Sequence, residues 1–237
     1  MELRDFKDEE DLSRWAADYV VSRILLRPEM LLCVATGHST DRLCMMLVDA
    51  IHDRRANIER LRLIQLDEWW GLAPDDAGRC DVQLHHRLVK PLGISPDRFI
   101  SFDSDTHDAA AACRSMAARL AAEGPIDVCV LGMGRNGHLG FNEPGPYLSA
   151  GVHVAALTEQ TRRHAMVDRM EASPHRGVTL GMANIMAARD VILVVMGAGK
   201  IRAVEDVRSH QIRTACPASL LHLHPKAQCG IYKANNE

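Results

Sequence analysis

The chain has 237 residues, of which 47% are apolar and 25% charged, and its formal net charge is -3. This composition predicts a globular protein large enough for one α/β domain. The near-neutral charge argues against nucleic acid or a membrane surface as the main partner, and no apolar run approaches the ~20 residues of a membrane span. A charged N-terminus and seven scattered cysteines without a C-x-x-C pair predict a cytoplasmic protein with reduced thiols.

Apolar strand-like runs alternate with helical patterns along the chain. Helices are expected over residues 8–27, 43–51, 107–123 and 158–170 and after residue 200. Strands are expected over residues 31–35, 61–66, 126–131 and 191–196, with weaker patterns over 152–157 and 228–232. This alternation predicts a three-layer α/β/α sandwich with a mostly parallel, Rossmann-like sheet, and no linker or repeat divides the single domain expected over residues 1–237.

Four loops with chemically useful side chains directly follow expected strands. They comprise residues 36–40, 67–68, 132–143 and 197–200. Because the carboxyl ends of parallel strands share one edge of a sheet, we expect these loops to converge on one site.

The longest of these loops is rich in glycine. Residues 132–137 match the G-x-G-x-x-G pattern of dinucleotide-binding folds. That interpretation requires a helix to begin within the loop, and the prolines of the segment 142–146 (N-E-P-G-P) forbid one. We therefore expect no nicotinamide or flavin cofactor, and we interpret glycines such as Gly134 as places where the backbone approaches a small anionic or hydroxylated ligand.

Several polar side chains in these loops suit acid–base chemistry. A carboxylate at Glu143 can orient the imidazole of His138, and Asn136 can hydrogen-bond the ring or the backbone. Asp67 and Glu68 are adjacent at a strand end, so one can face the site while the other caps or pairs with a neighbour. Such residues are often ordinary turn formers, but their expected convergence makes Asp67 a candidate general base.

The first loop joins a strand to a helix N-terminus, where backbone donors, hydroxyl groups and the helix dipole suit a phosphate. Its residues are Thr36, Gly37, His38, Ser39 and Thr40. Lys200 can add a cation to the same anion. Three arginines of a polar helical segment are most simply residues of a solvated face, although one of them can bind a phosphate bidentately; they are Arg162, Arg163 and Arg169. The histidine pairs at 85–86 and 222/224 lack a third ligand at zinc-like spacing, so no metal is expected.

Six segments resemble the motifs of one enzyme family in order along nearly the whole chain. They are 35–39 (A-T-G-x-S), 66–72 (L-D-E-W-x-G-L), 132–145 (G-M-G-x-N-G-H-x-x-F-N-E-P-G), 178–181 (V-T-L-G), 197–200 (G-x-x-K) and 223–226 (L-H-P-K). The family is that of the glucosamine-6-phosphate deaminases/isomerases, which also includes the 6-phosphogluconolactonases. The F-N-E-P continuation and the D-E-W-x-G-L motif are similar to the amino-sugar branch rather than to the lactonases.

The resemblance implies a reaction without metal or cofactor. Ser39, the surrounding loop backbone and Lys200 would hold a 6-phosphate. His138, oriented by Glu143, would move a proton at the ring oxygen, and Asp67 would transfer a proton from C2 to C1. The implied products are a ketohexose 6-phosphate and ammonia.

The resemblance also bears on the substrate and on competing functions. Asn136 stands where glucosamine enzymes typically carry aspartate and is similar to the galactosamine-6-phosphate subgroup, so galactosamine 6-phosphate is favoured and glucosamine 6-phosphate comes next. The alternatives are hydrolysis of 6-phosphogluconolactone and a non-catalytic sugar-phosphate sensor. The expected partner is a small sugar phosphate, and a homo-oligomer is compatible with the sequence.

Overall fold

The computed structural model describes residues 1–163, 173–197 and 199–232. Its helices are α1 (Glu9–Leu26), α2 (His38–Asp53), α3 (Cys80–Leu84), α4 (Ala109–Glu123), α5 (Glu159–Arg162), α6 (Met182–Met186) and α7 (Ile201–Arg208), with a π-helical turn at His85–Val89 and 3-10 turns at Pro96–Arg98 and Pro217–Leu223. Its strands are β1 (Glu2–Phe6), β2 (Leu31–Val34), β3 (Arg62–Ile64), β4 (Asp67–Trp69), β5 (Phe99–Ile100), β6 (Val128–Gly132), β7 (His153–Ala156), β8 (Arg176–Thr179), β9 (Asp190–Val195) and β10 (Ala227–Tyr232).

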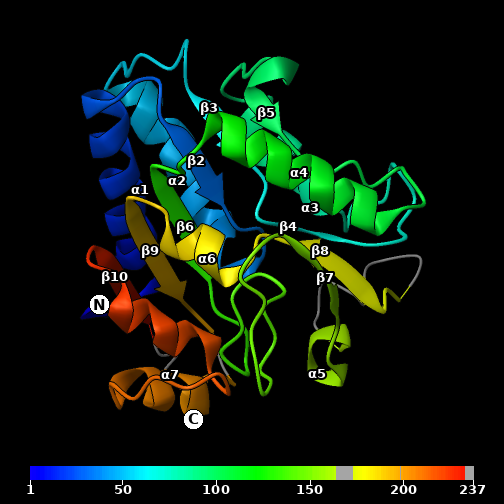
Figure 1. The fold of residues 1–237 in the computed structure, drawn as a ribbon. Coiled ribbons are helices and arrows are strands. Elements are labelled where there is room, and N and C mark those ends of the chain that lie inside the picture. Colours follow the sequence, from blue (N-terminus) through cyan, green and yellow to red (C-terminus); the bar gives the residue numbers. More distant parts are fainter. Residues whose placement is uncertain (164–172, 198, 233–237) are drawn as a thin grey trace.

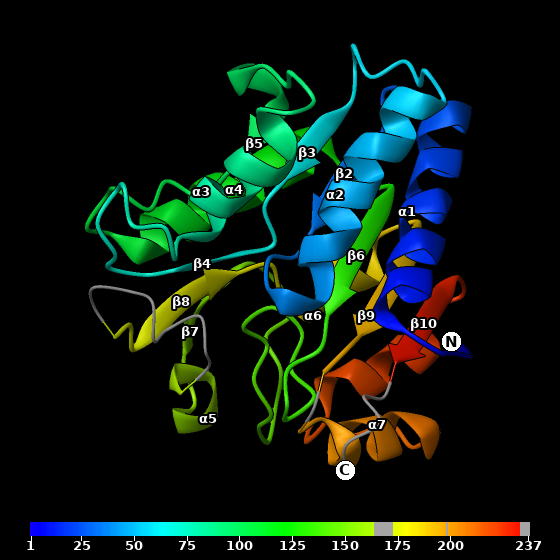
Figure 2. The ribbon, with the colours of Figure 1, turned by 180° about the vertical axis from the view of Figure 1, so that it is seen from behind.

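Seven of these strands form one parallel sheet in the order β1-β10-β9-β6-β2-β3-β5. The sheet is apolar on both faces, since Leu31 and Cys33 of β2 pack in one core cluster and Leu32 and Val34 in the other. Helices α1 and α2 cover one face, and α4 and α6 lie on the opposite side (Figures 1 and 2). The predicted three-layer α/β/α architecture is therefore confirmed.

A second sheet departs from the predicted arrangement. Its three antiparallel strands have the order β4-β8-β7. The expected strand over residues 61–66 ends at Ile64, and Asp67–Trp69 then forms β4 in the small sheet. The pattern failed here because Leu66 is buried, as a strand residue would be, although it lies in the link between two sheets. Consequently Asp67 is held by pairing with Thr179 and does not lie in a free loop.

Other differences are local. Strands β1, β5 and β8 and helix α6 were not anticipated. Of the helix expected over 158–170, the described part is α5, which ends at Arg162, and residues 164–172 lie outside the described ranges. All seven cysteines are buried and unpaired, as predicted. Across the described residues, no helix combines the length and the apolar character needed to cross a bilayer.

Candidate active site

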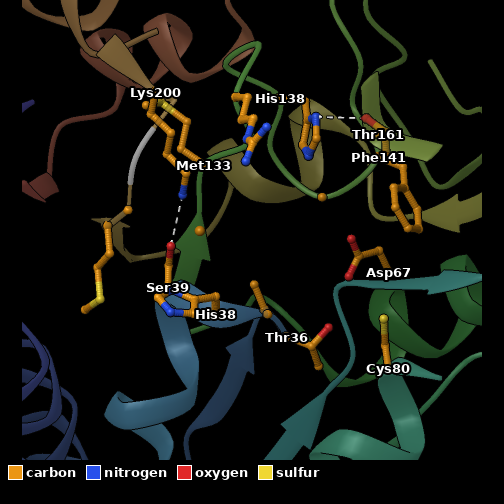
Figure 3. A pocket seen from close by; sticks show the side chains of 18 of the residues that line it. Thr36, His38, Ser39, Asp67, Cys80, Met133, His138, Phe141, Thr161 and Lys200 are labelled. Carbon is orange, nitrogen blue, oxygen red and sulfur yellow. Dashed lines mark hydrogen bonds between the residues drawn. The ribbon is translucent and has the colours of Figure 1, made fainter. Parts of the chain in front are cut away.

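A cavity of about 310 Å³ lies at the carboxyl ends of the central strands. It is lined by the loops after β2, β6 and β9 and by Asp67 of β4, so the four segments expected to converge do meet (Figure 3). The lining residues are Ala35, Thr36, Gly37, His38, Ser39, Asp67, Trp69, Cys80, Gly132, Met133, Gly134, Arg135, His138, Gly140, Phe141, Thr161, Met196, Gly197 and Lys200. Of the predicted site residues, this set includes Asp67, His138, Gly134 and Lys200, together with the loop residues 36–39.

Four other predicted site residues lie outside the lining. Glu143 and Asn136 stand behind His138. The hydroxyl of Thr40 is turned inward and donates to the carbonyl oxygens of Ala35 (2.7 Å) and Gly37 (3.0 Å). The guanidinium of Arg162 lies 3.4 Å from the ring of His175.

The loop after β6 closes tightly because its glycines have no side chains. The amide of Gly134 donates to the carbonyl oxygen of His138 (3.0 Å), and the amide of Gly137 donates to that of Gly134 (3.0 Å). A Cβ at Gly134 would lie 2.5 Å from Nδ1 of His138, so only glycine allows the imidazole to rest against this backbone. As expected from its prolines, the segment after His138 does not continue as a helix.

His138 is held by a carboxylate and a hydroxyl group. Its Nδ1 lies 3.5 Å from Oε2 of Glu143 and 3.4 Å from Oγ1 of Thr161. Glu143 also accepts hydrogen bonds from Thr161, from Thr158 (3.2 Å) and from Nδ2 of Asn136 (2.9 Å). Burial acts to raise the pKa of Glu143, but the hydrogen bond and charge of His138, together with Thr161 and Asn136, lower it to about 2. Glu143 is therefore a fixed anion at neutral pH.

Asp67 faces the cavity on the side away from Lys200, next to Cys80 and Thr36 (Figure 3). Burial raises its pKa to about 7, and the charge of His138 works in the opposite direction. A carboxyl group with a pKa near neutrality can both accept and return a proton under physiological conditions. Asp67 is therefore suited to shuttle a proton.

Glu68 points away from the cavity and organises the wall behind Asp67. It is fully buried, and its two oxygens accept four hydrogen bonds, from Gln65 Nε2 (2.7 Å) and from the amides of Trp69 (2.8 Å), Cys80 (2.9 Å) and Asp81 (2.9 Å). Burial, and next the negative charge of Asp81, raise the pKa of Glu68, whereas the hydrogen bonds from the amides of Cys80 and Asp81 and from Gln65 favour its ionised form. The prediction that one of the two adjacent acids faces the site while the other pairs with neighbours is thus confirmed.

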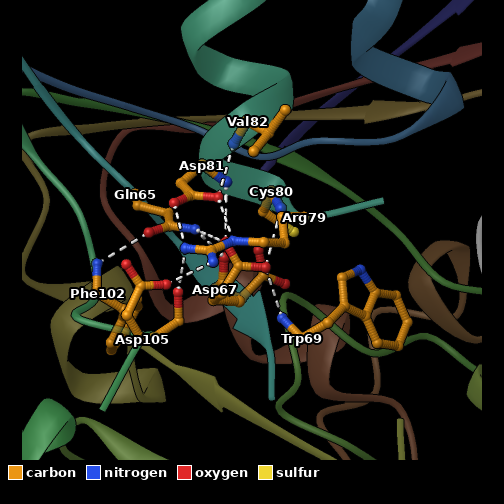
Figure 4. Close-up of polar contacts among 11 residues, drawn as sticks. Gln65, Asp67, Trp69, Arg79, Cys80, Asp81, Val82, Phe102 and Asp105 are labelled. Carbon is orange, nitrogen blue, oxygen red and sulfur yellow. Dashed lines mark hydrogen bonds and ion pairs between the residues drawn. The ribbon is translucent and has the colours of Figure 1, made fainter. Parts of the chain in front are cut away.

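Two further contacts complete this wall. Gln65 donates from Nε2 to the backbone oxygen of Asp67 (2.9 Å) and accepts from the amide of Phe102 (2.9 Å). The buried guanidinium of Arg79 is paired with Asp81 and Asp105, both at 2.7 Å (Figure 4). Strand β4, which carries Asp67, is therefore fixed on its buried side by side chains that lie outside the cavity lining.

The opposite end of the cavity is cationic. Nζ of Lys200 donates to Oγ of Ser39 (3.1 Å) at the first turn of α2, whose N-cap, Gly37, has a φ of 118° that favours glycine. Burial, and next the positive charge of Arg135, lower the pKa of Lys200 to about 8. A lysine, a serine and a helix N-terminus together form a site suited to a phosphate.

Several lining residues were missed by the sequence reasoning. Thr161 joins Glu143 to His138, and its only signal in the sequence was its place within the helix expected over residues 158–170. Arg135 lies inside the glycine motif but carries no periodic or spacing signal of its own. In the described part of the chain, no cluster of three or more histidine, cysteine or acidic residues is arranged to hold a metal ion. The histidines at 222 and 224 instead contact backbone oxygens.

Comparisons with known proteins agree with this geometry. Residues 7–229 match the family model described as glucosamine-6-phosphate isomerases/6-phosphogluconolactonase. The chain is 37% identical to the "Putative deaminase AgaI" of Escherichia coli (strain K12), over 93% of this chain and 87% of that protein. It is 36% identical to a glucosamine-6-phosphate deaminase of Streptomyces avermitilis, over 85% of this chain and 78% of that protein.

Solved structures extend the likeness to three dimensions. A monomeric glucosamine-6-phosphate deaminase superposes with a TM-score of 0.92 at 28% identity, covering 98% of both chains. A 6-phosphogluconolactonase from Trypanosoma brucei shares the fold, with a TM-score of 0.78 at 21% identity and coverage of 98% of this chain and 95% of that one.

Proposed function

This chain belongs to the family of glucosamine-6-phosphate isomerases and 6-phosphogluconolactonases, and we propose that it isomerises and deaminates an amino-sugar 6-phosphate. Like the relatives named above, it is an enzyme. The observation that carries the proposal is the separation of charge within one cavity. The acidic side chain of Asp67 lies on one side, and the Lys200–Ser39 pair lies on the other. A sugar phosphate lying between them would present its phosphate to the cation and its reacting carbons to the carboxylate.

The reaction begins with ring opening. His138 moves a proton at the ring oxygen while Glu143 keeps the imidazole oriented and balances its charge. Asp67 then removes the proton from C2, which the neighbouring carbonyl group makes acidic, and returns it to C1. In the same step the oxygen on C1 gains a proton and the nitrogen on C2 loses one. The C2 imine formed in this way adds water and loses ammonia, which leaves a ketohexose 6-phosphate. Loop amides after β6 are suited to stabilise the developing oxyanion.

We propose galactosamine 6-phosphate as the preferred substrate and glucosamine 6-phosphate as the second. The proposal rests on Asn136, because asparagine at this position of the glycine-rich motif resembles the galactosamine subgroup, whereas glucosamine enzymes typically carry aspartate there. Its amide donates to Oε2 of Glu143 (2.9 Å), a contact that an aspartate at this position would replace with repulsion between two anions.

The buried, unpaired cysteines support a reducing compartment, so we assign the reaction to the cytoplasm.

An assay of purified protein tests the proposal. Galactosamine 6-phosphate, glucosamine 6-phosphate and 6-phosphogluconolactone are supplied separately, and ammonia release and lactone hydrolysis are measured. Ammonia release from an amino sugar without lactone hydrolysis supports the proposal. Lactone hydrolysis without ammonia release would contradict it, and tight binding of an amino-sugar phosphate without any product would favour the sensor.

A further inference from the structure

A second cation shares the anion-binding end of the cavity with Lys200. Arg135, from the loop after β6, lines the cavity together with Lys200 and Ser39. The sequence patterns had assigned no role to Arg135.

Arg135 lies directly over the backbone that precedes Lys200. A Cβ at Gly199 would stand 3.2 Å from Nε of Arg135 and 3.5 Å from its Cζ, and the φ of Gly199 is +78°. The glycine thus leaves room for the guanidinium group beside the residue that carries the ammonium group. Burial, and next the positive charge of Arg135, lower the pKa of Lys200 to about 8.

This pair of cations has no counter-ion within the described residues. Neither Arg135 nor Lys200 forms an ion pair with a carboxylate there, although most arginines of the chain do. Asp67, the acidic residue that lines the cavity, lies on the side away from Lys200 (Figure 3). Two like charges held together without a carboxylate repel each other, and an anion between them would relieve that repulsion.

We propose that Arg135 and Lys200 jointly bind the phosphate of the substrate as a dianion. This inference rests on the proposed function, since it assigns a residue to the phosphate end of the same site. A guanidinium group can hold two phosphate oxygens at once while the ammonium group and Ser39 hold the third. The arrangement therefore selects a phosphate monoester, which carries close to two charges at neutral pH, over a sulfate ester with one charge.

Isothermal titration with inorganic phosphate near pH 7 tests this role without relying on turnover. We compare the unmodified protein with Arg135→Met, Arg135→Lys and Arg202→Met. Arg202 lies in the first turn of α7, is exposed and is outside the cavity lining, so its replacement removes the same charge near Lys200 without removing a phosphate contact. Thermal melting of each variant verifies that the fold is kept.

We expect Arg135→Met to weaken phosphate binding by at least ~10-fold, Arg135→Lys to weaken it less, and Arg202→Met to change it by less than about twofold. Equal losses in Arg135→Met and Arg202→Met, or no phosphate binding by the unmodified protein, would overturn the inference. The outcome is separable from that of the proposed function. Phosphate binding that depends on Arg135 without ammonia release would contradict only the proposed function, and ammonia release with Arg135-independent phosphate binding would contradict only this inference.

Discussion

The Nδ1 atom of His138 lies 3.5 Å from Oε2 of Glu143. The hydroxyl group of Thr161 contacts both side chains, and the amide of Asn136 donates to Glu143 from the other side. Because the pKa of Glu143 is held at about 2, the imidazole always faces a negative charge. The pair is thus prepared to move a proton at the ring oxygen of a sugar.

Replacing Glu143 with Gln should slow ring opening. The neutral glutamine side chain replaces the anion that orients His138. We therefore expect kcat/KM to fall by roughly 10²–10³-fold, with the loss mainly in kcat. Steady-state kinetics measure the change. Glu159→Gln is the matched control, because Glu159 is an exposed residue of α5 outside the cavity lining. Equal activities of the two variants would refute the role of Glu143.

Gly134→Ala should displace the imidazole of His138. The added methyl group would stand 2.5 Å from Nδ1, so the ring or the loop must move. A misplaced proton donor is expected to reduce kcat by ~10²-fold while the midpoint of urea unfolding changes little. Gly151→Ala provides the comparison, since a Cβ at Gly151 meets no atom within 4 Å. A kcat that stays at the level of the Gly151→Ala protein would show that the close contact is unimportant.

The dependence of kcat/KM on pH should be a narrow bell. Asp67 must be ionised to take a proton, so activity rises with pH through its pKa of about 7. Lys200 must be protonated to hold the phosphate, so activity falls as pH passes its pKa of about 8. Lys200→Arg keeps the cation at higher pH and should move only the alkaline limb upward. An alkaline limb that stays in place in this variant would exclude Lys200 as its origin, because titration of the substrate is common to both proteins.

The adjacent residues Asp67 and Glu68 should respond oppositely when neutralised. The folded state raises the pKa of Asp67 from 3.8 to about 7, so its carboxylate costs stability as pH rises through that window and costs most above pH 7. Asp67→Asn should therefore increase the free energy of unfolding above that window by roughly 1–4 kcal/mol.

Glu68→Gln should instead lower the free energy of unfolding by roughly 2–4 kcal/mol. Burial raises the pKa of Glu68 as it does that of Asp67, but the two oxygens of Glu68 accept four hydrogen bonds. A glutamine has one oxygen in their place, so the amides of Trp69, Cys80 and Asp81 are left with too few acceptors. Urea unfolding curves of both variants measure the two signs. Changes of the free energy of unfolding in the same direction would contradict the distinction between Asp67, whose buried carboxylate costs stability, and Glu68, whose carboxylate holds the structure together.

The layers of the fold were predictable because each central strand is a short apolar run ended by a glycine or polar turn. The convergence of the loops followed from the shared edge of a parallel sheet, and so did the group of Asp67, His138 and Lys200. Strand β4 was not predictable, because its pairing with Thr179 joins segments over a hundred residues apart. Arg135 and Thr161 were missed for the same reason, since their roles depend on distances across loops and not on local patterns.

The most direct test of deamination by Asp67 is an ammonia-release assay. The unmodified protein and Asp67→Asn are measured side by side on galactosamine 6-phosphate and glucosamine 6-phosphate. We expect the unmodified protein to release ammonia, with galactosamine 6-phosphate the better substrate. Asp67→Asn should release ammonia at least ~10³-fold more slowly, while its stability is unchanged or increased. Undiminished ammonia release by Asp67→Asn, or none from either sugar with the unmodified protein, would contradict it.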